Sequence, residues 1–557
     1  MRVAWPSTSS PVSAARYFTA SFLLLASPSH AARRQTFAFT QQARRVAGST
    51  TSTTTSGRRR FRSSTSSTTV RSGSMEATAL GSNGTCGSGS GTRTAPSLPM
   101  FLESCSSTAR KRQQSTAACF HVFSGNEACD ADSMCSAICM AFLKQSTAAT
   151  TAAAAGTSGG EVVYIPVMPI PRADLALRRE VMVLFELCGI EPSTVVFSDE
   201  LDLSALQAEG RLRLTLMDHN AVSGGLSALG GAVVEIVDHH KDLEEHPSVQ
   251  GGARDIAFDA SDGSGKALVG SCCTLVAERM LAREEEQGPK LLSSDVARLL
   301  LGVILVDTVN LDTEAKRATE RDVAAAEQLS RRVSWASSAP RGPRKAFCRS
   351  CATPNEMFDT LRNAKFDPAF WEELSAADCL RYDYKSFHPA GESGGEAGAA
   401  DGEERRHKPR PFKFGMSSVL CRLETLAEKG GDKGSGDALA AFAAARGVDS
   451  LAVMTVTLDD EENMKKELLI FTHTKRRCEQ MREYFEGPHG EFLKLEAAAP
   501  PGTSFGGKAS RSDHEKRVGA EEAGGGWFLR WEMGNARPSR KQVAPAIASF
   551  YESVSDI

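Results

Sequence analysis

Short apolar runs alternate with longer amphipathic stretches between residue 117 and about residue 330. An apolar run bounded by turn-forming residues is typical of a buried strand, whereas apolar residues spaced three and four apart are typical of a helix. Strands that alternate with helices predict a mostly parallel sheet covered on both faces, which is an α/β fold. The predicted strands are 118–125, 161–170, 193–201, 211–220 and 232–240, and the predicted helices are 132–145, 175–189, 271–286 and 295–310.

The alternation stops after residue 330, where Arg, Pro and Ser predominate and a linker is predicted. A second, smaller α/β region follows, and it is interrupted by Gly-rich stretches at 390–408, at 428–437 and near 500–526. Such insertions are typical of surface loops, which accept extra length at a small free-energy cost. The predicted division is an extension (1–115), a first domain (116–330), a linker (331–352) and a second domain (353–557).

The first hundred residues differ in composition from the rest of the chain. They contain no Lys and one acidic residue, Glu76, and they are rich in Ser, Thr, Ala and Arg. The apolar run at residues 22–26 is too short to span a bilayer, and with the Arg residues after it the run resembles part of a signal peptide or an organellar presequence. We expect a disordered extension and a soluble protein of the cytoplasm or of a mitochondrial or plastid matrix. A low-complexity extension without a targeting role is the alternative.

Charge and cysteine content exclude few functions. The net charge of −3 gives no reason to expect a nucleic-acid partner. The 14 cysteines are scattered, which is typical of reduced core residues rather than of a disulfide framework. Cys348 and Cys351 form a single CxxC pair, and a zinc site would need a second pair of ligands. For Cys129 and Cys135 the sequence leaves open a redox role or plain core packing.

Acidic residues recur where the predicted strands of the first domain end. Asp130 and Asp132 follow the first strand, Asp218 and Asp238 close two later strands, and Asp307 ends an apolar run. Ligands of open α/β sheets bind beyond the carboxyl ends of the strands. Taken singly, each residue is more typical of a helix cap or a turn. Taken together with nearby His residues, they predict one or two divalent cations, Mn²⁺ or Mg²⁺, whose charge offsets the repulsion among the acids.

Five short motifs, in this order, resemble the DHH phosphoesterase superfamily: GNEACDADS, LMDHN, VDHHKD, GSCCTLV and LVDTVNLDT. RYDYKSF and RPSRKQVAPAI resemble the DHHA2 domain of manganese-dependent inorganic pyrophosphatases, exopolyphosphatases and prune proteins. IPVMPIPRADLALRREVMVLFELCGI, followed by VVFSDELDL, is similar to the exopolyphosphatase/prune branch. The resemblance covers about residues 118–330 and 353–550. It implies a mostly parallel DHH domain followed by a smaller α/β DHHA2 domain.

The resemblance assigns roles to the polar residues of the first domain. Asp218 would bridge or share the cations and, with His240, would act in the chemistry. His240 would face the substrate phosphate as a proton donor or hydrogen-bond partner, and Asp238 would orient the two histidines. The implied metal ligands are Asp130, Asp132, Asp218, His239 and Asp307, with Asn126 at a further position.

Basic residues of the second domain would bind the substrate. By resemblance, Lys385 of DYK and Arg540 with Lys541 of SRK would clamp phosphate oxygens. A planar guanidinium binds phosphate through two parallel hydrogen bonds, and an ammonium adds a point charge. Arg178 is a further candidate, and an exposed charge on a helix face is its alternative.

Two departures from the family patterns bear on activity. The family's pyrophosphatases carry a His where this chain has Asn126, and the exopolyphosphatase/prune branch tends to carry Asn there. Because Asn is a poor ligand for Mn²⁺, this position is expected to hold a weaker or Mg²⁺-preferring site, or none. Animal prune proteins depart from the second His of the DHH motif. This chain keeps His240, which favours a working hydrolase.

These features favour a metal-dependent hydrolase of phosphoanhydrides, and an exopolyphosphatase that acts on inorganic polyphosphate is preferred. Pyrophosphate, short polyphosphates and nucleoside polyphosphates are further candidate substrates. One alternative is a prune-like interaction protein with weak hydrolysis of short-chain polyphosphates or nucleotides. Another is a DHH-type nuclease or cyclic-dinucleotide phosphodiesterase, which the SRK motif disfavours. The oligomeric state cannot be predicted from the sequence.

Overall fold

The computed structural model describes most of both domains and part of the extension. The predicted targeting segment and Cys348 lie outside the described residues. The described residues are 97–111, 119–155, 162–261, 265–286, 290–312, 317–335, 351–387, 412–430, 434–459, 463–497, 503–504, 507–508, 521–523 and 525–554.

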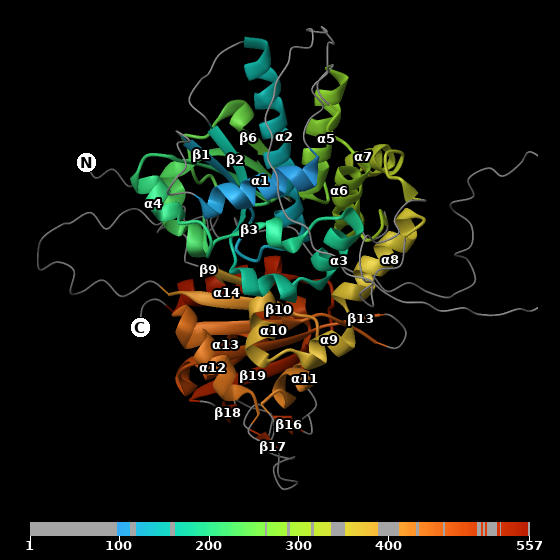
Figure 1. The fold of residues 1–557 in the computed structure, drawn as a ribbon. Helices are drawn as coiled ribbons and strands as arrows, with labels where there is room; N and C mark the ends of the chain where they lie inside the picture. Colours follow the sequence, from blue (N-terminus) through green and yellow to red (C-terminus); the bar gives the residue numbers. More distant parts are fainter. Residues whose placement is uncertain are drawn as a thin grey trace, which may run out of the picture. The chain divides into compact units, whose positions relative to one another are not determined.

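Six strands form the sheet of the first domain in the order β3-β2-β1-β4-β5-β6 (Figure 1). Every neighbouring pair is parallel, as the alternation of strands and helices predicted. The chain runs outward from β1 through β2 to β3 and then returns to place β4 on the other side of β1. The loops that follow β1 and β4 therefore face each other, which is where ligands bind in such sheets. The strands are β1 (Cys119–Ser124), β2 (Val162–Met168), β3 (Val196–Phe197), β4 (Leu212–Met217), β5 (Val233–Asp238) and β6 (Arg254–Ile256).

The predicted helices of this domain are present and pack in one hydrophobic cluster with the sheet. The region predicted as one helix at 175–189 is divided, because residues 172–177 form a 3₁₀ turn before α3 begins. Serine and threonine side chains cap three of the helices by accepting hydrogen bonds from backbone amides, as expected for N-cap residues. The helices are α2 (Ala131–Ala155), α3 (Arg179–Cys188), α4 (Leu203–Ala208), α5 (Cys272–Glu285), α6 (Ser294–Asp307) and α7 (Glu320–Ser330).

Two helices outside the predicted boundaries of the first domain belong to its core. Helix α1 (Leu98–Arg110) lies in the segment predicted as extension, yet its Phe101 and Leu102 are buried. Helix α8 (Pro354–Lys365) follows the predicted linker, and its Met357 and Leu361 are buried in the cluster of the first domain. The hydrophobic face of each helix is short, and only the packed structure shows which surface it covers.

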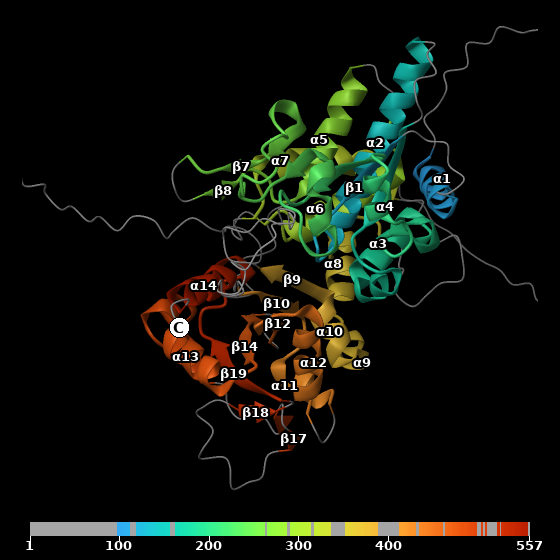
Figure 2. The same ribbon diagram turned by 90° about the vertical axis from the view of Figure 1, so that its left-hand side faces the viewer.

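The sheet of the second domain is mixed. Its order is β15-β19-β14-β11-β10-β9, with β18 paired to β19, and β10 and β11 are the parallel neighbours among otherwise antiparallel pairs. Helices α10, α11 and α12 cover one face, and α13 and α14 cover the other (Figure 2). The strands are β9 (Asp383–Phe387), β10 (Phe414–Val419), β11 (Ser450–Thr455), β14 (Glu467–Thr472), β15 (Leu495–Ala497), β18 (Glu521–Ala523) and β19 (Gly526–Met533). The helices are α9 (Pro368–Glu373), α10 (Ala376–Tyr382), α11 (Leu423–Glu428), α12 (Gly436–Arg446), α13 (Lys475–Glu486) and α14 (Arg540–Ser553).

Within the described ranges, no helix is both long enough and apolar enough to cross a membrane.

Candidate metal centre

Asp218 lies at the centre of the site, directly after β4. Its backbone adopts a left-handed conformation with φ of +63°, which an Asp residue tolerates better than most. Its backbone amide donates to the carbonyl oxygen of Val237 at 2.9 Å. The hydrogen bond joins the ends of β4 and β5 and brings Asp218 beside His239 and His240, which follow β5.

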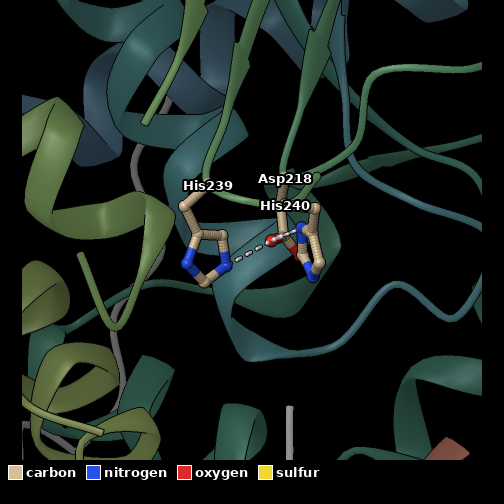
Figure 3. A group of neighbouring side chains, drawn as sticks. All are labelled: Asp218, His239 and His240. Atoms are coloured by element: carbon tan, nitrogen blue, oxygen red, sulfur yellow. Dashed lines mark ion pairs between the residues drawn. The ribbon is translucent and has the colours of Figure 1, made fainter. Parts of the chain in front are cut away.

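The two carboxylate oxygens of Asp218 have different surroundings. Oδ2 accepts hydrogen bonds from Asn126 Nδ2 and Ser133 Oγ, both at 2.8 Å. Oδ1 is buried, and among the described residues no donor forms a hydrogen bond to it. It lies 3.2 Å from His239 Nε2 and 3.6 Å from His240 Nδ1 (Figure 3). Oδ1 of Asp218 is therefore a buried acceptor that points at two imidazoles.

When His239 is neutral, the lone pair of its Nε2 faces Asp218 Oδ1. Its Nδ1 donates to the carbonyl oxygen of Val269 at 3.0 Å, because a carbonyl group can only accept. Nε2 is then a second acceptor, facing Asp218 Oδ1. Burial opposes protonation of His239, but Asp218 and Asp132 outweigh burial and raise the pKa of His239. The pair thus requires positive charge between its two atoms, from a proton or from a metal ion.

Asp238 orients the neighbouring histidine. It is fully buried, and its Oδ1 accepts hydrogen bonds from the backbone amides of His239 and His240 and from His240 Nδ1 at 2.7 Å. Its Oδ2 accepts from Asn220 Nδ2. Burial opposes ionisation of Asp238, but His240 and these donors hold its pKa well below the ordinary value. Asp238 thus fixes the orientation of the His240 ring through Nδ1.

Asp132 is fixed by the start of helix α5. Its carboxylate accepts from the hydroxyl of Ser271 at 2.8 Å and from the amides of Cys272 and Cys273 at 2.7 and 2.9 Å. The amides of the first turn and the helix dipole favour a negative charge at this position. Oδ2 of Asp132 also lies 3.7 Å from His239 Nε2. The GSCCTLV motif therefore holds a carboxylate against the same imidazole that Asp218 faces.

Asp130 and Asp307 complete the group of acids. Asp130 Oδ1 accepts from the amide of Ser133 at 3.1 Å and so caps α2. Asp307 is the last residue of α6, and its Oδ2 is buried without a hydrogen-bond donor among the described residues. Burial and then the charges of Asp132 and Asp130 raise the pKa of Asp307. The acids are thus close enough to disfavour one another's ionisation.

This donor set fits a divalent cation. Asp218, His239 and His240 each offer a ligand atom within 4.8 Å of the others. Buried acceptors without donors, and acids whose pKa values are raised, are the arrangement that a bound cation relieves. Carboxylates with imidazole suit a hard or borderline divalent ion. Asp132 Oδ2 lies 3.7 Å from His239 Nε2, so Asp132 adjoins this cluster, whereas Asp130 and Asp307 remain predicted ligands.

Asn126 contacts Asp218 through its amide. Its Oδ1 accepts from the amide of Ala128 at 3.0 Å, while its Nδ2 donates to Asp218 Oδ2 at 2.8 Å. The side-chain nitrogen of Asn126 thus orients the Asp218 carboxylate, and the side-chain oxygen of Asn126 accepts a backbone hydrogen bond.

Arg178 lies in the interior of the first domain and is 2% exposed. Its guanidinium donates to the carbonyl oxygens of Ala128, Cys129 and Asp174 at 2.5, 3.2 and 2.9 Å. This geometry favours a role in holding the loop after β1, which carries the first two acids. Cys129 and Cys135 are also buried, and burial raises the pKa of both thiols.

The predicted phosphate-binding residues lie on β9 and α14 of the second domain. Arg540 donates through Nη1 to the carbonyl oxygen of Asp383 at 3.0 Å, and its Nη2 lies 2.8 Å from Asp383 Oδ1. Lys385 follows two residues later on the same strand. Lys541 is the second residue of α14, and its side chain lies outside the described part of the chain. Asp383 thus links the two basic motifs.

Comparison with known proteins agrees with this architecture. The DHH family, N-terminal domain, matches residues 122–304, and the DHHA2 domain matches residues 359–550. Exopolyphosphatase PRUNE1 of Bos taurus is 30% identical over 440 residues, which cover 78% of this chain and 77% of that protein. The chain belongs to the exopolyphosphatase/prune branch of the DHH phosphoesterase superfamily. The resemblance of the sequence motifs to this branch is confirmed.

Two further members of the exopolyphosphatase/prune branch cover similar shares of the chain. Exopolyphosphatase PRUNE1 of Homo sapiens is 29% identical over 444 residues, which cover 78% of this chain and 77% of that protein. A putative exopolyphosphatase of Schizosaccharomyces pombe is 27% identical over 451 residues and is covered over 93% of its length.

In this DHH phosphoesterase, the motifs did not indicate several residues that contact the site. Glu127, beside Asn126, accepts from the amide and hydroxyl of Ser386 on β9 at 3.0 and 3.1 Å. Ser133 donates to Asp218 and is the last residue of the GNEACDADS motif, although the motif did not show this contact. None of the quoted sequence motifs contains Lys365 at the end of α8, because the acids that interact with it are distant in sequence.

Proposed function

We propose that this chain is a metal-dependent exopolyphosphatase, which releases phosphate from the end of inorganic polyphosphate. The observation that carries the proposal is the pairing of two buried acceptors, Asp218 Oδ1 and His239 Nε2, at 3.2 Å. The names of the relatives in Bos taurus, Homo sapiens and Schizosaccharomyces pombe support the choice of substrate.

Some residues of the chain would hold the cation, and others would bind the phosphate. When bound, a divalent cation activates water for attack and withdraws charge from the phosphoryl group. Asp238 holds His240 so that the Nε2 edge of its ring faces the substrate, where it donates a hydrogen bond or a proton to a phosphate oxygen. Asp383 holds Arg540, which with Lys385 and Lys541 stabilises charge on the phosphate chain.

The proposed cation is Mn²⁺ or Mg²⁺, in one or two copies. The imidazole of His239 favours Mn²⁺, whereas the surrounding carboxylates accept either ion. Asn126 engages Oδ2 of Asp218 through its amide, which leaves Oδ1 of Asp218 to face the cation. Asp218 would therefore hold a cation through Oδ1.

Pyrophosphate and tripolyphosphate are the nearest alternative substrates, because they carry the same anhydride bond. The proposed location is the cytoplasm or an organellar matrix, on the strength of the Arg-rich and acid-poor first hundred residues.

Phosphate release from the purified full-length chain tests the proposal. Pyrophosphate, tripolyphosphate and long polyphosphate are offered separately with Mn²⁺, with Mg²⁺ or with a chelator. We expect metal-dependent release that falls by a factor of about 10³ or more in His239→Ala, because the cation loses its imidazole ligand. His489→Ala is the matched control, since His489 is exposed and stacks on Tyr484.

Absence of release from every substrate, with a folded protein that binds Mn²⁺, would overturn the proposal. In that case the chain is better described as a prune-like interaction protein. Equal release by wild type and His239→Ala would show that the activity arises elsewhere or from a contaminant.

A further inference from the structure

We propose that Lys365 is a further substrate-binding residue, whose ammonium group binds an oxygen of the phosphoryl group that is cleaved. The inference rests on the proposed function of the metal centre and extends its binding site to a helix that no sequence motif marks.

Helix α8 places Lys365 against the first domain. Met357, Leu361 and Ala364 of this helix are each 1% exposed or less and belong to the core of that domain. Lys365 is the last residue of the helix, where the carbonyl end of the helix dipole favours a cation. The position of its side chain is thus set by buried apolar contacts and not by a surface loop.

The ammonium of Lys365 forms an ion pair with a buried carboxylate of the first domain. Nζ lies 3.7 Å from Oε1 of Glu180. Burial opposes the charge of Lys365, but Glu180, Asp130, Asp307 and Asp383 outweigh burial and raise its pKa. Two of these acids, Asp130 and Asp307, are among the predicted metal ligands. Lys365 therefore lies within electrostatic range of two predicted metal ligands.

A cavity joins Lys365 to that centre. Asp130, Lys365, Asp383 and Ser418 are among the residues that line it, and its volume is about 30 Å³. A space of this size holds one water molecule, and an oxygen of a phosphoryl group needs similar room. An oxygen bound there lies between the metal ligand Asp130 and the carboxylate that holds Arg540. The cavity thus places a phosphoryl oxygen between the metal centre and the basic residues of the second domain.

Two other polar residues that line the cavity, Arg178 and Glu180, form hydrogen bonds within the protein. Arg178 gives three hydrogen bonds to backbone carbonyl groups. Glu180 accepts from Tyr382 Oη at 3.2 Å, which helps to fix the position of its carboxylate. Glu180 and Tyr382 are positioning residues for the ammonium. A terminal phosphoryl group is strongly anionic, and a compact ammonium is a suitable point charge for it.

Three measurements on four proteins test the role of Lys365. The proteins are wild type, Lys365→Met, Lys365→Met combined with Glu180→Gln, and Lys475→Met. The double variant removes both charges of the pair, which protects against unfolding caused by an unpaired buried carboxylate. Lys475 has a side chain that is 60% exposed and serves as the charge-matched control. The measurements are Mn²⁺ binding, binding of imidodiphosphate to the Mn²⁺-loaded protein, and kcat/KM for tripolyphosphate.

We expect Lys365→Met and the double variant to lose affinity for imidodiphosphate by a factor of about 10 to 100, which is the effect of one charge-assisted hydrogen bond. Their kcat/KM should fall by at least the same factor. Mn²⁺ affinity should stay within about threefold of wild type or rise, because a cation has been removed from the neighbourhood. Lys475→Met should behave as wild type.

Unchanged imidodiphosphate affinity in both Lys365 variants would overturn the inference. A loss of Mn²⁺ affinity that accounts for the whole effect would also overturn it, since Lys365 would then support the acids and not the substrate. If wild type releases no phosphate but binds imidodiphosphate in a Lys365-dependent way, the proposed function fails, and Lys365 still stands as a residue that binds a phosphoryl oxygen. If wild type neither hydrolyses nor binds the analogue, both fail.

Discussion

Each polar group of Asp218 makes a different contact at the candidate metal centre. Its amide ties the end of β4 to the end of β5, Oδ2 is held by Asn126 and Ser133, and Oδ1 is left without a donor. Such an oxygen is costly to bury unless a cation reaches it. Asp218 thus joins the ends of β4 and β5 through its amide, and its Oδ1 is a buried oxygen that a cation would stabilise.

The metal-free protein should lose stability as the pH rises through neutrality. Burial and the charge of Asp132 raise the pKa of Asp218 to about 7. The folded state therefore binds more protons than the unfolded chain, and the free energy of unfolding falls as these protons leave. The pKa of His239 is raised as well, and its contribution is also lost as the pH rises. We expect a lower melting temperature of the chelator-treated protein at about pH 8 than at about pH 6.

Adding Mn²⁺ should reverse this trend, because the cation competes with protons for the same ligands. Thermal melts with chelator and with Mn²⁺, at several pH values, check both statements. A metal-free protein whose melting temperature stays constant or rises over this interval would show that the acids are not crowded as described. His489→Ala, which alters an exposed ring, is the control.

At the scale of elements, the starts of two helices form much of the centre. Asp130 caps α2, and the first turn of α5 gives Asp132 a hydroxyl and two amides. The ends of β4 and β5 supply Asp218 and the two histidines. Parallel strands make this convergence possible, because their carboxyl ends lie on the same edge of the sheet.

Helix α1 should contribute to the stability of the first domain, although it lies in a segment that its composition marked as low complexity. Leu102 is fully buried, whereas Met100 of the same helix is 63% exposed. We expect Leu102→Ala to lower the free energy of unfolding by about 2–5 kcal/mol, because the substitution removes buried apolar surface and leaves a cavity. Met100→Ala should change it by less than about 0.5 kcal/mol. Urea denaturation checks the pair, and equal midpoints would mean that α1 does not pack as described.

At the scale of the whole molecule, the two domains meet through partly exposed ion pairs and hydrogen bonds. Glu127 of the loop after β1 accepts from Ser386 on β9, the residue next to Lys385. Arg381 pairs with Asp174 at 3.2 Å, and Arg179 pairs with Asp367 at 3.2 Å. The loop that carries the predicted ligands Asp130 and Asp132 is thus bonded to the strand that carries Lys385.

Breaking the bond between Glu127 and Ser386 should affect the substrate more than the cation. We expect Glu127→Ala to lower kcat/KM for tripolyphosphate by a factor of about 10, because Lys385 loses its fixed distance from the centre. Mn²⁺ affinity should stay unchanged, since Glu127 is not a ligand. Glu286→Ala, at a side chain that is 67% exposed, is the control. Parallel losses of Mn²⁺ affinity and activity would place Glu127 in the metal centre instead.

The sequence by itself determined the alternation of strands and helices, the division into DHH and DHHA2 domains, and the acids and histidines at the strand ends. These follow from local patterns, since hydrophobic periodicity and short motifs involve neighbouring residues. The sequence also indicated that Asp238 orients the histidines, which its hydrogen bonds to His240 support.

Only the tertiary structure decided that α1 and α8 pack on the first domain. It also decided that the Arg178 guanidinium donates to backbone carbonyl groups of the loop after β1 and that Lys365 lies near acids distant in sequence. The structure also set which oxygen of Asp218 lacks a donor. Each of these depends on contacts between residues far apart in the chain. Burial and charge at such contacts are properties of the packed molecule, so no local pattern in the sequence contains them.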